Sequence, residues 1–308
     1  TSNFRAGVNA GNSITSGGNF NVLVGDEAGT AITTGDNNVA VGYAALDANT
    51  TGASNTAVGD LALTDNTTGG SLVAVGRYAL GANTTGVYNV GVGYQALYNN
   101  TTGDKNVAVG YQSLKSNTTA DYNTAFGDQA LESNTTGGFN TAVGYIALDA
   151  NTTASYNTSI GAYSLTENTT GESNTAVGQT ALRLNTTGNA NTAVGRQALD
   201  AEVAGNYSTA VGYQALTGQS QSGDVDVYNT AVGYNAGAAV TTGIQNTLIG
   251  GLAGDAITTG GNNTAVGMNA LTANTTASYN SAFGKSSLLS NTTGANNSAV
   301  GFGSLGNN

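Results

Sequence analysis

The stretch NVAVGYAALDANTTGAS, residues 38–54, returns in close copies along the chain, as NVGVGYQALYNNTTGDK at 89–105 and NTAVGYIALDANTTASY at 140–156. The glycine that follows AV recurs every seventeen residues, and we take it as the marker of each repeat. One step, from Gly212 to Gly233, is twenty-one residues, and a degenerate copy around Gly7 lies eighteen residues before Gly25. The marker glycines are Gly25, Gly42, Gly59, Gly76, Gly93, Gly110, Gly127, Gly144, Gly161, Gly178, Gly195, Gly212, Gly233, Gly250, Gly267, Gly284 and Gly301.

The repeat is too short for helices, and its β-branched residues alternate with small ones. A unit of this length cannot bury its own apolar face, so the units must stack on one another. We therefore predict an all-β fold, a parallel β-solenoid (β-roll) of about 18 coils of 17 residues, with residues 1–308 forming a single repeat domain. The segment 217–229 is the one insertion, and we predict a surface loop there.

Composition excludes several classes of protein. The net charge is −11, the acids are scattered and no basic patch is present, so we predict no nucleic-acid partner. No apolar run is long enough to span a bilayer, so we predict no membrane insertion. The chain begins at Thr1 without a visible signal peptide, which favours a processed protein or a segment of a longer one.

The residue types needed for most enzyme chemistry are missing. The chain has no histidine and no cysteine, and acids such as Asp60, Glu167 and Asp255 fall at non-equivalent positions of the repeat. A nucleophile with its base, or a calcium site repeated in every coil, would need such residues at fixed positions. We predict no enzyme activity, no cofactor and no catalytic or metal-binding residues.

The repeat also suggests how each coil packs. Val41 and Val58 stand before the marker, and Thr or Val stands two residues earlier. These two positions share a strand face, and we predict that this face forms the core. The residue three after the marker is always small, as at Ala45, which predicts a close contact there. The marker glycine itself predicts a backbone shape or a packing distance that a Cβ atom would forbid.

Two positions change together. Most coils have Leu four residues after the marker and Asn seven after it, as in Leu46 and Asn49. Wherever Leu becomes Gly, Asn becomes Ile or Val, which predicts that both side chains reach one cavity and that a single large aliphatic fills it. The altered pairs are Gly11 with Ile14, Gly29 with Ile32, Gly237 with Val240, and Gly254 with Ile257.

The NTT triplets allow two interpretations. Each is an acceptor sequence for N-glycosylation, which would make the chain a glycoprotein with a column of glycans. Each asparagine could instead bond to the next coil in an amide ladder, and its replacement by Ile or Val favours this inward position. A second asparagine column, four residues before the marker, is typical of a turn ladder. The NTT asparagines are Asn49, Asn66, Asn83, Asn100, Asn117, Asn134, Asn151, Asn168, Asn185, Asn274 and Asn291.

Aromatic and threonine residues form further columns. A surface aromatic column and a second column, five residues before the marker, could stack sugars or contact another subunit, or could pack side by side along the solenoid. The Thr pairs could bind ice, although adjacent residues point to opposite faces and leave one outward Thr per coil. The first column is Tyr43, Tyr94, Tyr111, Tyr145, Tyr213 and Tyr234, and the second is Tyr88, Tyr122, Phe139, Tyr156, Tyr207, Tyr228 and Tyr279.

The repeat resembles known fibre repeats. NVAVG at 38–42 and NTAVG at 140–144 resemble the SVAIG-type coil of YadA-like head domains in trimeric autotransporter adhesins, and NTAVGY…NTT is similar to repeats of phage tail fibres and bacterial surface fibres. The resemblance covers nearly the whole chain. It implies a left-handed β-roll assembled as a trimer.

We therefore predict a non-catalytic structural repeat protein of an extracellular fibre or adhesin, on a cell surface or a virion appendage. Neither the first nor the last coil has an evident polar cap, which favours self-association as a homotrimer or an end-to-end filament. The alternative is a solenoid that binds glycans or ice.

Overall fold

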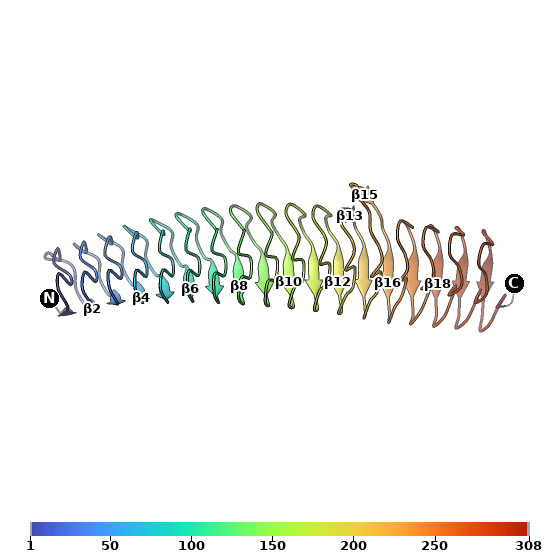
Figure 1. Ribbon diagram of the computed structural model, residues 1–308, viewed down its shortest axis with the longest axis horizontal. Coiled ribbons are helices and arrows are strands. Elements are labelled where there is room, and N and C mark those ends of the chain that lie inside the picture. Colours follow the sequence, from blue (N-terminus) through green and yellow to red (C-terminus); the bar gives the residue numbers. More distant parts are fainter. Residues whose placement is uncertain (1, 307–308) are drawn as a thin grey trace. The chain divides into compact units, whose positions relative to one another are not determined.

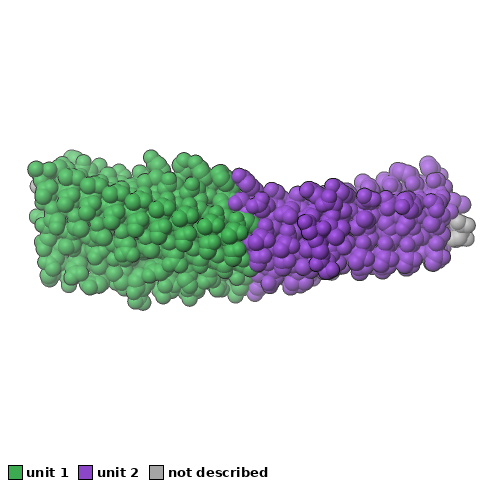
Figure 2. Space-filling view, turned by 90° about the horizontal axis from the view of Figure 1, so that it is seen from above, with its two compact units in different colours: residues 1–154 green, residues 155–308 purple. Residues whose placement is uncertain are grey.

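The computed structural model describes residues 2–306, and the chain divides into two compact units, residues 1–154 and residues 155–308 (Figure 2). Each unit is a parallel β-solenoid, and no helix occurs among residues 2–306. The all-β solenoid with coils of seventeen residues is therefore confirmed. The division falls between the markers Gly144 and Gly161, inside an ordinary repeat.

Every coil contributes one three-residue strand to the main sheet, and β13 and β15 form a separate pair (Figure 1). The strands of the first unit are β1 Phe4–Ala6, β2 Val22–Val24, β3 Val39–Val41, β4 Thr56–Val58, β5 Val73–Val75, β6 Val90–Val92, β7 Val107–Val109, β8 Thr124–Phe126 and β9 Thr141–Val143. Those of the second are β10 Thr158–Ile160, β11 Thr175–Val177, β12 Thr192–Val194, β13 Gly205–Asn206, β14 Thr209–Val211, β15 Val225–Asp226, β16 Thr230–Val232, β17 Thr247–Ile249, β18 Thr264–Val266, β19 Ser281–Phe283 and β20 Ser298–Val300.

Equivalent residues of successive coils lie side by side within each unit. Val39 of β3 pairs with Thr56 of β4, seventeen residues later, and the strands run parallel. In the second unit β14 pairs with β16 across the longer coil, so that Thr209 still faces Thr230. The register thus keeps each position of the repeat in its own column.

The marker glycine needs both a special backbone shape and a close approach, as predicted. Gly59 has φ +142°, a value that residues with a side chain rarely adopt. A Cβ atom on Gly59 would lie 2.6 Å from the carbonyl oxygen of Gly76 in the next coil, which is closer than real Cβ contacts. The backbones of successive markers therefore touch directly, and only glycine fits.

The prediction that this strand face forms the core is wrong. From β2 on, the middle residue of each three-residue strand is buried, for example Ala40 and Ala57, whereas the flanking residues are half-buried or exposed. The core is filled instead by the Leu four residues after the marker, such as Leu46, which is fully buried. Because this leucine reaches across the narrow coil, only a small side chain fits on the strand opposite, and the valines point outward.

The linked exchange of Leu and Asn has the predicted cause and one further partner. A Cβ atom on Gly29 would lie 2.7 Å from the Ile32 side chain and 2.9 Å from that of Leu23, the middle residue of β2. Leu23 and Ile32 are both fully buried. Two aliphatic side chains thus occupy the space of the missing leucine, and in the second unit Leu248 and Ile257 occupy it beside Gly254.

The exchange to glycine also relieves backbone strain. Leu46 has φ +57° and Gly29, at the same position of its coil, has φ +58°. A left-handed conformation costs a residue with a side chain roughly 1–2 kcal/mol, and glycine adopts it freely. The position therefore accepts glycine wherever other side chains fill the core.

The insertion lies in the coil between Gly212 and Gly233. Strand β15 pairs with β13, residues 222–226 are exposed, and Val227 returns to a fully buried position. Figure 1 shows this segment standing out from the regular coils. The backbone N–H of Gln245 then donates to the carbonyl of Val227, so the regular pattern resumes in the following coil.

We expect Gly233→Ala to destabilise the second unit strongly. Gly233 has φ +140°, and a Cβ atom there would lie 2.6 Å from the carbonyl carbon and oxygen of Gly250. The combined strain and overlap should cost about 3 kcal/mol or more. The matched control is Gly251→Ala, where a Cβ atom meets nothing within 4 Å. Thermal unfolding followed by circular dichroism measures both, and equal midpoints would contradict the role of the marker.

Candidate functional surfaces

The described part of the chain offers columns rather than a cavity. Residues 2–306 form no pocket and no group of His, Cys, Asp or Glu that could hold a metal ion. Nor do they contain a helix of sufficient length and apolar character to cross a bilayer. The candidate functional surfaces are columns of side chains that repeat from coil to coil.

The NTT asparagines form a buried amide ladder in the first unit. The Nδ2 group of Asn66 donates to Oδ1 of Asn49 (2.9 Å), and Asn83 donates to Asn66 in the same way (2.9 Å). The same Nδ2 group of Asn66 also donates to the carbonyl of Gly69 (3.0 Å). The ladder continues through Asn151, and each of these side chains is fully buried.

This geometry bears on the predicted glycosylation. Both hydrogens of the Asn66 amide are used inside the protein, and no part of the residue reaches solvent. The other acceptor asparagines are equally buried, with at most 3% exposure at Asn291. A glycan on any of them would have to displace these bonds and leave the core.

The second asparagine column is also a ladder. The backbone N–H of Asn55 donates to Oδ1 of Asn38 (3.0 Å), and Nδ2 of Asn38 donates to the carbonyl of Gly52 (3.0 Å). Both side chains are fully buried. Each asparagine thus ties its own coil across the turn and accepts from the next coil, as a turn ladder requires.

Glu202 replaces the NTT asparagine in the coil before the insertion. The carboxylate is fully buried, and its Oε1 accepts from the backbone N–H groups of Val203, Gly205 and Gln221 at 2.9, 2.8 and 3.1 Å. Its Oε2 accepts from the amide of Gln219 (2.7 Å), which occupies the ladder position of the next coil. Hydrogen bonds to a charged acceptor offset the cost of burying it. Aligning the repeats on the NTT asparagine position would have revealed Glu202 and Gln219 from the sequence alone.

Both aromatic columns lie on the surface. In the first column, Tyr94 and Tyr111 stack with ring centroids 5.5 Å apart and planes at 16°. In the second, Tyr122 and Phe139 stack at 4.8 Å and 10°. These contacts support the interpretation as side-by-side packing, because each stack covers one face of both rings. All six tyrosines of the first column are exposed, namely Tyr43, Tyr94, Tyr111, Tyr145, Tyr213 and Tyr234.

The threonine pairs divide their roles as predicted. The hydroxyl of Thr50 donates to the carbonyl of Thr67 in the next coil (3.0 Å), and Thr67 repeats the bond to Thr84 (3.0 Å). The second member of each pair, such as Thr51 and Thr68, is exposed. One threonine hydroxyl per coil is therefore engaged by the backbone, and one side chain faces solvent.

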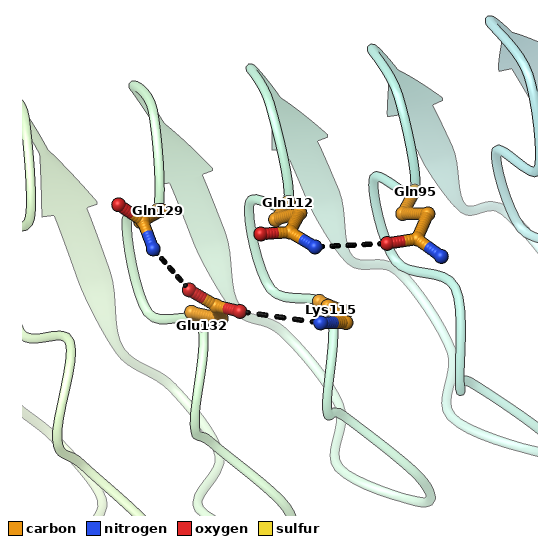
Figure 3. A network of polar contacts seen from close by, with 5 residues as sticks. All are labelled: Gln95, Gln112, Lys115, Gln129 and Glu132. Atoms are coloured by element: carbon orange, nitrogen blue, oxygen red, sulfur yellow. Dashed lines mark hydrogen bonds and ion pairs between the residues drawn. The ribbon is translucent and has the colours of Figure 1, made fainter.

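Charged and amide side chains join coils along another edge. Figure 3 shows the amide of Gln112 donating to Gln95 (2.9 Å), and Glu132 between Lys115 (3.4 Å) and Gln129 (2.7 Å). Ion pairs of this half-exposed kind contribute about 0–1 kcal/mol. These contacts therefore hold neighbouring coils together.

Partial burial of the Asp255 carboxyl group raises its pKa above the usual value.

The outer strand face was missed by the sequence reasoning, which placed it in the core. We use this name for the first and third residues of the three-residue strands, nine strands in each unit. None of these residues is charged, although the chain carries a net charge of −11. Phe126 is 56% exposed, Phe283 43% and Val75 37%. From β2 on, the third positions are all Val, Ile or Phe, whereas the first positions of the second unit are all Thr or Ser. An uncharged, partly apolar strip of this kind is typical of an interaction surface.

Comparison with known proteins adds no family. No protein family model matches the chain, and no curated protein matches it.

We expect Asn100→Ala to destabilise the first unit by about 2–3 kcal/mol, because the carbonyl of Gly103 and both neighbouring ladder amides would lose a buried partner. The matched control is Asn99→Ala, one residue earlier and only half-buried, which should change stability by less than about 0.5 kcal/mol. Chemical denaturation reports both. Equal losses would argue against the ladder.

We further expect the NTT asparagines to carry no glycans after secretion from a host cell that glycosylates proteins. In the folded chain both hydrogens of the amides from Asn66 to Asn151 are bonded inside the protein, and every NTT asparagine is at most 3% exposed. Intact mass spectrometry of the secreted protein should show the mass of the unmodified chain. Hexosamine on any NTT asparagine of correctly folded protein would contradict this expectation.

Proposed function

We propose that this chain is a non-catalytic structural module of an extracellular fibre or adhesin, and that copies of it associate through the outer strand face. The supporting observation is that this face is uncharged along each unit and carries exposed or half-exposed Val, Ile or Phe at the third position of every three-residue strand from β2 on. The coils behind it are held by continuous parallel pairing and by the amide ladders, which suits a load-bearing element.

A second copy of the chain is the occupant that fits this face best. Its rungs repeat at the same spacing of about 4.8 Å, so equivalent side chains of two copies can interlock along the whole contact. The face contains no charge that would have to lose water. The acidic residues that give the chain its net charge lie outside the face, where copies can keep them in solvent.

The resemblance to YadA-like head repeats and to tail-fibre repeats supports an extracellular location and a trimer. It rests on the AVG marker and on the NTT triplets, which occur in most coils of both units. An end-to-end filament is the other arrangement open to a solenoid.

Ice binding is the second candidate, because one observation favours it. The hydroxyls of strand threonines such as Thr175 and Thr192 make no hydrogen bond within residues 2–306, unlike those of the NTT threonines. Together with the neighbouring valines they form a regular array of hydroxyl and methyl groups that could order water. A thermal-hysteresis assay with monomeric protein distinguishes this activity from self-association.

Glycan binding by the aromatic columns is less favoured than either. Each stacked pair covers one face of both of its rings, which reduces the open ring surface on which a sugar could stack.

We expect the double variant Val75→Glu and Val232→Glu, with one change on each unit, to shift the protein from oligomer to monomer. Both valines are 37% exposed on the outer strand face, and each new carboxylate would have to be buried in the contact. Sedimentation velocity over a range of protein concentrations measures the change.

The matched control places the same charges elsewhere. Thr68→Glu and Thr276→Glu alter exposed threonines of the NTT triplets, away from the strands. This control should associate like the unmodified chain. If the unmodified chain is monomeric at the highest concentration, or if both double variants dissociate equally, the outer strand face is not the contact.

A further inference from the structure

Tyrosine pairs on the surface are aligned for covalent coupling. Tyr94 stacks on Tyr111 in the first unit, with ring centroids 5.5 Å apart and planes at 16°. The two rings come from successive coils and are 37% and 50% exposed. We propose that such stacks are sites of oxidative dityrosine cross-linking, which joins neighbouring coils covalently.

Two further stacks join the same pair of coils in the second unit. Tyr207 lies 5.2 Å from Tyr228 with planes at 8°, and Tyr213 lies 5.5 Å from Tyr234, also at 8°. All four rings are exposed. The first pair precedes strands β14 and β16, and the second pair follows them. The two stacks therefore brace both ends of this strand pair.

The position of these two stacks is informative. The coil between β14 and β16 is the one that carries the four additional residues of the insertion. Its amide ladder is replaced by Glu202 and Gln219, so the regular asparagine bonds are absent there. Covalent links on both sides of the strand would hold the register where the repeat is interrupted.

Composition directs oxidation to tyrosine. The chain has 15 tyrosines and one methionine, with no cysteine, tryptophan or histidine to compete. Backbone pairing already holds the stacked rings together, so coupling needs little further loss of freedom. Tyr78 and Tyr98 also meet, but edge to face at 78° and half-buried, and they do not belong to this set.

The coupling requires an external oxidant, and a peroxide used by a peroxidase is the chemical class that fits. Each phenol loses one electron and one proton, and the two radicals form a carbon–carbon bond between ring positions ortho to the hydroxyls. The hydrogens on those carbons then leave as protons while the oxygens regain theirs. The two electrons and two protons released per link reduce one peroxide, whose O–O bond breaks, to two waters.

The test is oxidation of the purified full chain by horseradish peroxidase and hydrogen peroxide at low protein concentration. We expect a mass loss of two hydrogen atoms per link, dityrosine fluorescence, and cross-linked peptides that map to Tyr94–Tyr111, Tyr207–Tyr228 and Tyr213–Tyr234. Tyr111→Phe, Tyr228→Phe and Tyr234→Phe should each remove one link. The thermal midpoint of the unmodified chain should rise after oxidation, and that of the triple variant should not.

The chain supplies its own controls. Tyr122 stacks on Phe139, which has no phenol, so this pair should form no link until Phe139→Tyr creates one. Tyr43→Phe should leave the pattern unchanged, because Asp26 and Asp60 occupy its position in the neighbouring coils. Links only between chains, links scattered over Tyr43 and Tyr279, or no new link in the Phe139→Tyr variant would each overturn the proposal.

Discussion

The close approach of successive marker glycines is the constraint on which the structure depends. A Cβ atom on Gly59 would overlap the carbonyl of Gly76, and the same holds for the markers up to Gly127 in the first unit and from Gly161 to Gly284 in the second. This backbone contact fixes how tightly each coil sits on the next. Strand pairing, amide ladders and aromatic stacks all require equivalent residues of adjacent coils to lie at one constant separation. A single atom at the marker would disturb every column of its coil.

The narrow coil explains why the small strand residues lie in the core and the larger ones on the surface, the reverse of what the sequence predicts. Leu46 enters the core from a left-handed backbone position, and this leaves room only for a residue as small as Ala40 on the strand. Where Leu23 occupies the strand, Gly29 must replace the leucine. The larger β-branched residues are therefore displaced to the surface. The uncharged, partly apolar outer strand face follows from the narrow core, and a second copy that covers it would complete the burial that one coil cannot provide.

Sequence reasoning predicted the seventeen-residue period of the coils, the turn ladder and the linked exchange, and it favoured the NTT ladder over glycosylation, because each of these repeats with the period of the chain. It failed for the strand face, because alternation tells which residues share a face but not which face points inward. The usual preference for large apolar residues inside pointed to Val41 rather than Ala40. Only the left-handed conformation of Leu46 reverses that choice, and no propensity of leucine predicts such a conformation.

The columns of the solenoid differ in how much change they tolerate, and function is expected in the tolerant ones. At the inward ladder position, replacements such as Glu202 and Ile32 occur only with compensation, by new hydrogen bonds for the first and by refilled volume for the second. At the position after the marker, Tyr43, Asp60 and Arg77 follow one another without any compensating change in the core. Surface chemistry can thus vary coil by coil while the stack is preserved. A binding surface on such a scaffold is a line of side chains whose length is set by the number of coils, so its strength can grow by repetition without the need for a cavity.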